Sequence, residues 1–153
     1  MPQVETKDRQ AWMAVLAKAG RDELEALWSA IPEPPAYRFL RKPETGLAMV
    51  RGRIGGTGQA FNMGEMTMTR AAVQMTGEAG ETIAGFAHVA GRDQRHAELA
   101  AAFDAMLQDR RWHRLVKQGV VTPLAQAQTE TKKRQAAATA KTRVDFFTLV
   151  RGE

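Results

Sequence analysis

The sequence contains no cysteine among its 153 residues. Disulfide bonds, thiolate zinc sites, cysteine nucleophiles and cysteine-held iron–sulfur clusters are therefore excluded. Long apolar runs are also absent, and no stretch approaches the ~20 residues that a helix needs to span a bilayer. The first residues, MPQVETKDRQ, are polar and charged, unlike a secretory signal peptide. These absences predict a cytoplasmic protein with no membrane contact.

Acidic residues are missing from one segment near the C-terminus. Lys and Arg total 22 and Asp and Glu 17, a formal net charge of +5, and the residues between Thr131 and Arg143 account for that whole excess. Such a segment can meet nucleic acid, a phosphorylated substrate or an acidic partner, or it can be a solvated helix face. Nucleic acid is the weakest interpretation, because neither a binding motif nor interleaved aromatic residues accompany the charge.

The length and the 44% hydrophobic content predict one domain, residues 1–153, with its own core. Apolar residues at helical spacing predict two helices before Pro32. A third helix is predicted after Asp93, the expected N-cap, with a stripe of apolar residues from His96 to Leu107. A last helix, about 123–140, is basic and polar all round, because Leu124 is its only large apolar residue.

The middle of the chain has the alternating pattern of strands. We expect about four strands in an antiparallel meander: 37–40, ended by Pro43 and the turn at residues 44–46; 47–54; about 61–75; and 82–89. The apolar alternation of the third shifts by one residue, which predicts a β-bulge near Gly64. The C-terminal run 144–150 is apolar on both strand faces. The predicted class is therefore α+β, ending in an apolar, strand-like segment.

The glycine-rich stretch 52–58 is the strongest candidate for a small-molecule site. Successive backbone N–H groups beside an arginine suit a phosphate, so the candidate phosphate contacts are Arg53, Gly55, Gly56, Thr57 and Arg70. The stretch lacks the Gly-Lys-Ser/Thr ending of a nucleotide P-loop. A tight turn between two strands explains the glycines equally well.

Catalytic and metal-binding constellations do not emerge from the spacing. His96 and Glu98 are two residues apart on a predicted helix and do not share a face. His88 and His113 belong to other elements, so no metal-ligand set is predicted. The catalytic residues of this chain, if it has any, are unknown at this stage, and no cofactor is expected to be bound by it.

Several runs resemble a known family. They are Arg9 to Met13, Glu44 to Leu47, Gly55 to Gly58, Thr69 to Val73, Gly91 to Asp93, His96 to Glu98, Asp104-Ala105 and Arg143 to Gly152. Together they resemble the G subunit of the bacterial carbon–phosphorus lyase system, over nearly the whole chain and in the same order.

The resemblance implies a role in phosphonate catabolism. In that system the G, H and I subunits, with the ATP-binding-cassette-like L subunit, replace the adenine of ATP by a phosphonate. Methylphosphonate gives α-D-ribose 1-methylphosphonate 5-triphosphate, and the J subunit then cleaves the carbon–phosphorus bond by radical chemistry on an iron–sulfur cluster. A chain without cysteine is not that J subunit. The resemblance implies that G is an accessory subunit, with H, I, J and L types as partners and ATP as a substrate of the complex.

Two hypotheses follow for this chain. It is either a scaffold without catalytic residues, or a subunit that lends arginine or backbone N–H groups to a shared active site. Residues 143–153 are too apolar on both faces to stay free in water, so we expect them to be a docking tail. The interface candidates in this tail are Arg143, Asp145, Phe146, Phe147 and Arg151.

Overall fold

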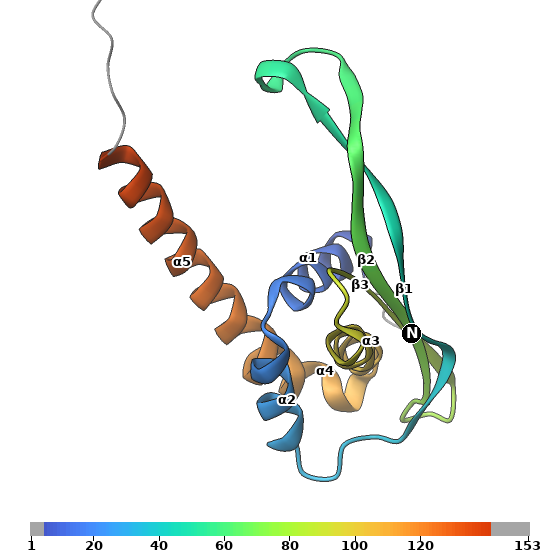
Figure 1. Ribbon diagram of the computed structural model, residues 1–153. Helices are drawn as coiled ribbons and strands as arrows, with labels where there is room; N and C mark the ends of the chain where they lie inside the picture. Colours follow the sequence, from blue (N-terminus) through green and yellow to red (C-terminus); the bar gives the residue numbers. More distant parts are fainter. Residues whose placement is uncertain (1–4, 142–153) are drawn as a thin grey trace, which may run out of the picture.

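The computed structural model describes residues 5–141 of the chain. Two helices come first, then a three-stranded sheet, and then a series of helices (Figure 1). The elements are α1 (Thr6–Lys18), α2 (Arg21–Ser29), β1 (Tyr37–Arg53), the 3₁₀ turn η1 (Ile54–Gly56), β2 (Ala60–Thr76), β3 (Thr82–Ala90), α3 (Gln94–Gln108), α4 (Arg110–Val116), the π-helical segment η2 (Lys117–Val121) and α5 (Thr122–Lys141). The predicted α+β class is confirmed.

The sheet is antiparallel with the order β1-β2-β3, so it has three strands and not the four expected. The expected turn at residues 44–46 is part of β1, which runs continuously past Pro43 with register shifts on both sides of Arg41. β1 is an edge strand, and proline is tolerated at an edge or a bulge because its missing N–H removes no ladder hydrogen bond there. Two predicted strands are therefore one irregular strand.

The β-bulge predicted near Gly64 is confirmed. Val50 pairs with Gly64 while Arg51 pairs with Asn62, which leaves Met63 as the extra residue of β2. The bulge explains why the apolar alternation of the sequence shifts there: Met63 and Met66 reach the same face of the ribbon although they are three positions apart, an odd number.

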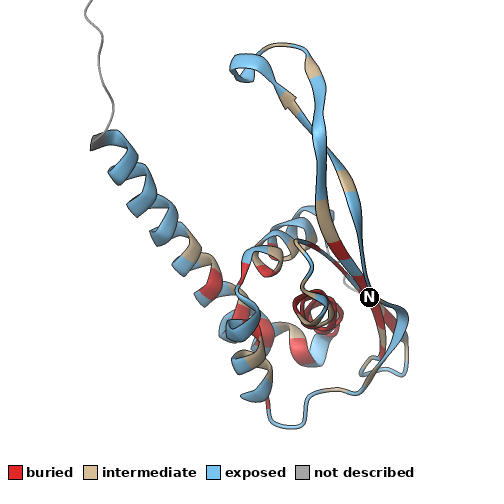
Figure 2. Ribbon diagram, in the orientation of Figure 1, coloured by how far each residue is buried: buried red, intermediate tan, exposed pale blue. Residues whose placement is uncertain are grey.

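The core lies between the sheet and the helices, with α3 at its centre. Helix α3 contacts all three strands as well as α1, α2 and α4, and Figure 2 shows it buried around its circumference. The predicted stripe from His96 to Leu107 is buried, and so are the alanines between its members. Gly85 of β3 is the point of closest approach, since a Cβ there would lie 2.0 Å from the carbonyl oxygen of Ala101.

The C-terminal helices follow one another without a loop. Helix α5 begins at Thr122, close to the expected start of the last helix, but η2 joins α4 directly to it and Thr122 donates to the carbonyl of Lys117 (2.8 Å). A π-helical segment just before Pro123 accommodates a residue that lacks an N–H. Figure 2 shows most of α5 exposed, in line with its polar sequence. The expected docking tail, 143–153, lies outside the described residues.

No helix among residues 5–141 is both long enough and apolar enough to span a bilayer.

Candidate functional site

The most prominent surface feature is a two-stranded arm, residues 47–67, that projects beyond the third strand (Figure 1). β3 ends at Ala90, which pairs with Met68, so the rest of the β1–β2 hairpin has no third strand. Every residue of the arm is exposed or half-buried. An isolated hairpin is only marginally stable in water, and this one is continuous with a packed sheet at its base.

One face of the arm is apolar. Ala48 pairs with Met66 and Gly52 with Phe61, and directly paired residues lie on the same face of an antiparallel ribbon. The sulfur of Met63 lies over Gly52, 2.3 Å from where a Cβ would be, so Met63 joins them. The exposed fractions are 45% for Phe61, 64% for Met63 and 37% for Met66. Large apolar side chains are thus gathered on this face and remain partly exposed to water.

The opposite face of the arm mixes apolar and basic residues. Leu47, Met49, Arg51 and Arg53 alternate along β1 and share this face. Leu47 is 65% and Met49 51% exposed. The arm therefore exposes large apolar side chains on both faces, and its two arginines lie near the tip.

The glycine turn forms the tip of the arm. Gly55 and Gly56 have positive φ (62° and 79°), and the N–H of Gly58 donates to the carbonyl of Ile54 (3.1 Å). Arg53 donates from Nη1 to the carbonyl of Gly58 (2.9 Å). The glycines therefore satisfy the geometry of a tight turn. The phosphate hypothesis for Arg53, Gly55, Gly56 and Thr57 stays a prediction.

Arg70 lies outside the arm, beyond its base, in a row of charged residues across the three-stranded part of the sheet. Glu44, Arg70 and His88 pair across the three strands on one face. Glu44 accepts from Arg41 (2.7 Å) and from Arg70 (2.6 Å), and these guanidinium groups hold the pKa of the Glu44 carboxyl below its usual value. Arg53 is nine positions after Glu44 on β1, a distance of about 30 Å at ~3.3 Å per residue. The structure does not bring Arg70 to the glycine turn.

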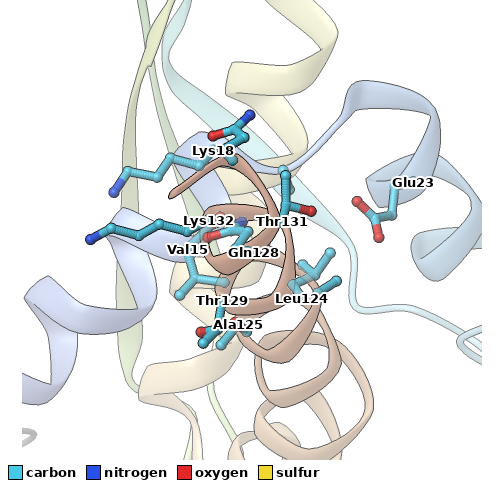
Figure 3. Close-up of a pocket in the computed structure, with 12 residues that line it drawn as sticks. Val15, Lys18, Glu23, Leu124, Ala125, Gln128, Thr129, Thr131 and Lys132 are labelled. Carbon is cyan, nitrogen blue, oxygen red and sulfur yellow. Dashed lines mark hydrogen bonds between the residues drawn. The ribbon is translucent and has the colours of Figure 1, made fainter. Parts of the chain in front are cut away.

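Open hollows flank these elements. One of about 420 Å³ lies beside the charged row, where Glu44, Arg70 and His88 contribute to its lining. A larger groove of about 660 Å³ lies between α1 and α5 (Figure 3). Val15 and Leu124 give it an apolar floor, and Figure 3 shows Lys18 and Lys132 extending in the same direction at its side.

The buried carboxylate of Asp104 joins three parts of the fold. It accepts from Arg9 (2.6 and 3.2 Å), from Trp12 Nε1 (2.8 Å) and from the N–H of Phe86 (2.9 Å). Its oxygens therefore anchor α1 and satisfy the open edge of β3, so the group is structural. The resemblance singled out Arg9, Trp12 and Asp104, but no local signal shows that residues more than 90 positions apart meet.

Other residues of the resembling motifs have similar structural roles. Asp93 is the N-cap residue of α3 and accepts from the N–H of His96 (2.9 Å), whose ring nitrogen Nε2 contacts the carbonyl of Leu16 (2.9 Å). Thr69 donates to the carbonyl of Gly91 (2.7 Å) where β3 turns into α3. Within residues 5–141, no cluster of three potential metal ligands occurs and every buried side-chain polar atom has a partner.

These features define a class: a small α+β protein whose buried polar groups serve the fold and whose most unusual feature is an uncovered apolar arm. A family model described as "Phosphonate metabolism protein PhnG" matches residues 7–152. A relative from Rhizobium meliloti (strain 1021), named "Alpha-D-ribose 1-methylphosphonate 5-triphosphate synthase subunit PhnG", is 44% identical over 146 residues, 95% of this chain and 90% of the relative. The chain belongs to the PhnG family of phosphonate metabolism proteins.

Proposed function

We propose that this chain is a subunit of the complex that forms α-D-ribose 1-methylphosphonate 5-triphosphate from ATP and methylphosphonate, with release of adenine. The observation that carries the proposal is the 44% identity, over 95% of the chain, with a relative named as a subunit of that synthase. We expect that the subunit does not act alone, because the relative is named as one subunit of a synthase.

The uncovered arm supports a role in an assembly. The chain exposes Leu47, Phe61 and Met63 on a two-stranded ribbon. Covering these side chains with another protein lowers the free energy of the system, so the ribbon favours association. The expected partners are the H, I and J types of core subunit and the L-type ATP-binding-cassette-like subunit. ATP is then a substrate of the assembled complex, and we expect this chain to bind no cofactor of its own.

The test compares the chain alone with the assembled complex. Purified chain incubated with ATP and methylphosphonate should release no adenine, whereas the complex obtained by expressing the subunits together should release it. Adenine release by the chain alone would contradict the dependence on partners. A complex that forms and turns over equally well without this chain would contradict its role as a subunit.

The arginine at the arm tip discriminates between a scaffold and a subunit that contributes to the active site. Arg53→Gln removes the charge but keeps a side chain that can donate to the Gly58 carbonyl, so the turn should persist. If Arg53 contacts a phosphate, the assembled complex should lose adenine release by ~10-fold or more, as expected for a lost charge-assisted hydrogen bond. Unchanged turnover in an intact complex would favour the scaffold.

A further inference from the structure

We propose that the arm, residues 47–67, inserts into an apolar cleft of a subunit of different sequence, and that carboxylates at the end of this cleft face Arg51 and Arg53. The inference rests on the proposed function, because it requires that the chain assembles with other subunits. It adds which surface makes the contact and what chemistry the partner must offer.

The shape of the arm requires a cleft and not a flat surface. Both faces carry exposed large apolar side chains: Phe61, Met63 and Met66 on one, and Leu47 and Met49 on the other. A flat partner surface would cover one face and leave the other in water. Only a partner that contacts both faces removes all five side chains from solvent, which is the arrangement that the hydrophobic effect favours.

The edges of the arm add a second requirement. β1 is the outer strand of the sheet along its whole length, and β2 has no paired strand on its far side from residue 60 to residue 66. Unpaired strand edges present backbone N–H and C=O groups that favour pairing with another extended segment. The walls of the cleft should therefore include a strand, or polar side chains that substitute for one.

Charge identifies the partner as acidic. The arm carries Arg51 and Arg53 against a single acidic residue, Glu65. Within residues 5–141, the side chain of Arg51 has no hydrogen bond or ion pair, while that of Arg53 is bonded to the turn. The other exposed, projecting element is α5, in which Lys132, Lys133 and Arg134 outnumber Glu130. A partner that contacts either element is favoured when its surface is negative.

The same charge argues against a second copy of this chain as the occupant. A two-fold interface brings the same patch of both chains together. The arginines near the two tips would then approach a surface that is also net basic, with Glu65 as the sole compensating residue of the arm. A partner of different sequence has no such constraint.

The absence of cysteine makes the contact directly testable, because one introduced thiol is the only one in the chain. Met63→Cys, labelled with a short photo-cross-linker and assembled with the other subunits, should cross-link to a subunit of different sequence at a peptide that contains Asp or Glu. Glu78→Cys, an exposed position in the turn between β2 and β3 at the opposite end of β2 from the arm, reports the background. Cross-links from Met63→Cys only to a second copy, to residues 142–153, or to nothing would overturn the proposal.

A charge-reversal pair tests the carboxylates separately. Arg51→Glu should weaken co-purification of the complex by ~10-fold or more, while Lys42→Glu, the same change on the same strand outside the arm, should leave it intact. If the two variants co-purify with the complex equally well, the proposed contact between Arg51 and carboxylates of the partner is wrong. If the unaltered chain fails to assemble with any subunit, the proposed function is wrong. If the complex forms but the arm stays accessible, the proposed function stands and only the inference about the arm is wrong.

Discussion

At the scale of single residues, the side chain of Asp104 joins α3 to α1 and β3. It is fully buried and is bound by Arg9, Trp12 and the backbone of Phe86. Asp104→Asn removes the charge that compensates Arg9 and replaces one acceptor oxygen by a donor. Because loss of one partner of a buried ion pair leaves the other uncompensated, we expect the free energy of unfolding to fall by about 3 kcal/mol.

Urea denaturation followed by circular dichroism measures this loss. Asp22→Asn is the matched control, since Asp22 also pairs with an arginine, Arg21, but its side chain is 89% exposed. Exposed ion pairs contribute roughly 0–1 kcal/mol, so the control should be nearly silent. A similar small effect at both positions would contradict the structural role given to Asp104.

Tyr37 offers a pH-dependent prediction. Burial raises the pKa of its phenol to about 12, and the carboxylate of Glu98, which accepts its hydrogen bond (2.7 Å), acts in the same direction. Between pH ~10 and ~12 the unfolded chain therefore binds fewer protons at this site than the folded chain, and stability falls as the pH rises. Tyr37 is the only tyrosine, so the ultraviolet absorbance of ionised phenol reports its titration directly.

The titration has a clear internal comparison. The folded chain should show a midpoint about two pH units above that of the urea-unfolded chain, whose tyrosine titrates near its reference pKa of about 10. Glu98→Gln removes the carboxylate and should move the folded midpoint toward the unfolded one. If the folded and unfolded chains titrate with the same midpoint, the phenol of Tyr37 is not in the buried environment beside Glu98 that the structure shows.

At the scale of elements, the contact between α3 and β3 depends on the absence of a side chain at Gly85. A Cβ at this position would lie 2.0 Å from the Ala101 carbonyl and 2.7 Å from the Ala105 nitrogen, both backbone atoms that cannot move alone. Gly85→Ala should therefore push the helix from the sheet and cost ~1–3 kcal/mol or more in thermal or urea unfolding. Gly46→Ala, in the exposed strand β1 with nothing within 4 Å, should have little effect.

How far the elements could be predicted depends on how local their causes are. The stripe of α3 and the bulge in β2 are visible because side-chain periodicity over a few neighbours determines them. The continuity of β1 cannot be seen in the sequence. A proline such as Pro43 usually ends a strand unless that strand lies at the edge of a sheet, and the position of a strand at an edge depends on the whole topology. Likewise, Thr122-Pro123 has the pattern of a helix start, but packing of Val116, Val120 and Leu124 on the core continues the helix.

The candidate site was predictable only in part. The apolar face of the arm follows from alternation in the sequence, yet its exposure does not, because exposure depends on which elements of the fold pack against that face (Figure 1). The separation of Arg70 from Arg53 follows from the register and from strand length, and neither is available without the pairing of β1 with β2. The row of Glu44, Arg70 and His88 also depends on register across three strands, so sequence reasoning found only its arginine.

At the scale of the whole molecule, the C-terminal residues give a further prediction. We expect deletion of residues 143–153 to abolish co-purification with the other subunits while the truncated chain keeps its circular dichroism spectrum. The physical reason is that the described chain has a core of its own, from Trp12 to Leu124, and the run 144–150 is too apolar to remain in water. An active complex that contains the truncated chain would contradict the docking role, and unfolding of the truncated chain would place the segment in its own core.

The methionines of the arm have a chemical consequence. Met49, Met63 and Met66 are 51%, 64% and 37% exposed, whereas Met75 and Met106 in the core are 4% and 0% exposed. Peroxide converts accessible thioethers to polar sulfoxides, so a chain that has not found its partners should be oxidised first on its arm. A sulfoxide there would oppose the burial of an apolar face. The interval between synthesis and assembly would then determine how many copies stay competent to join a complex, and the two core methionines would serve as unreacted references within the same molecule.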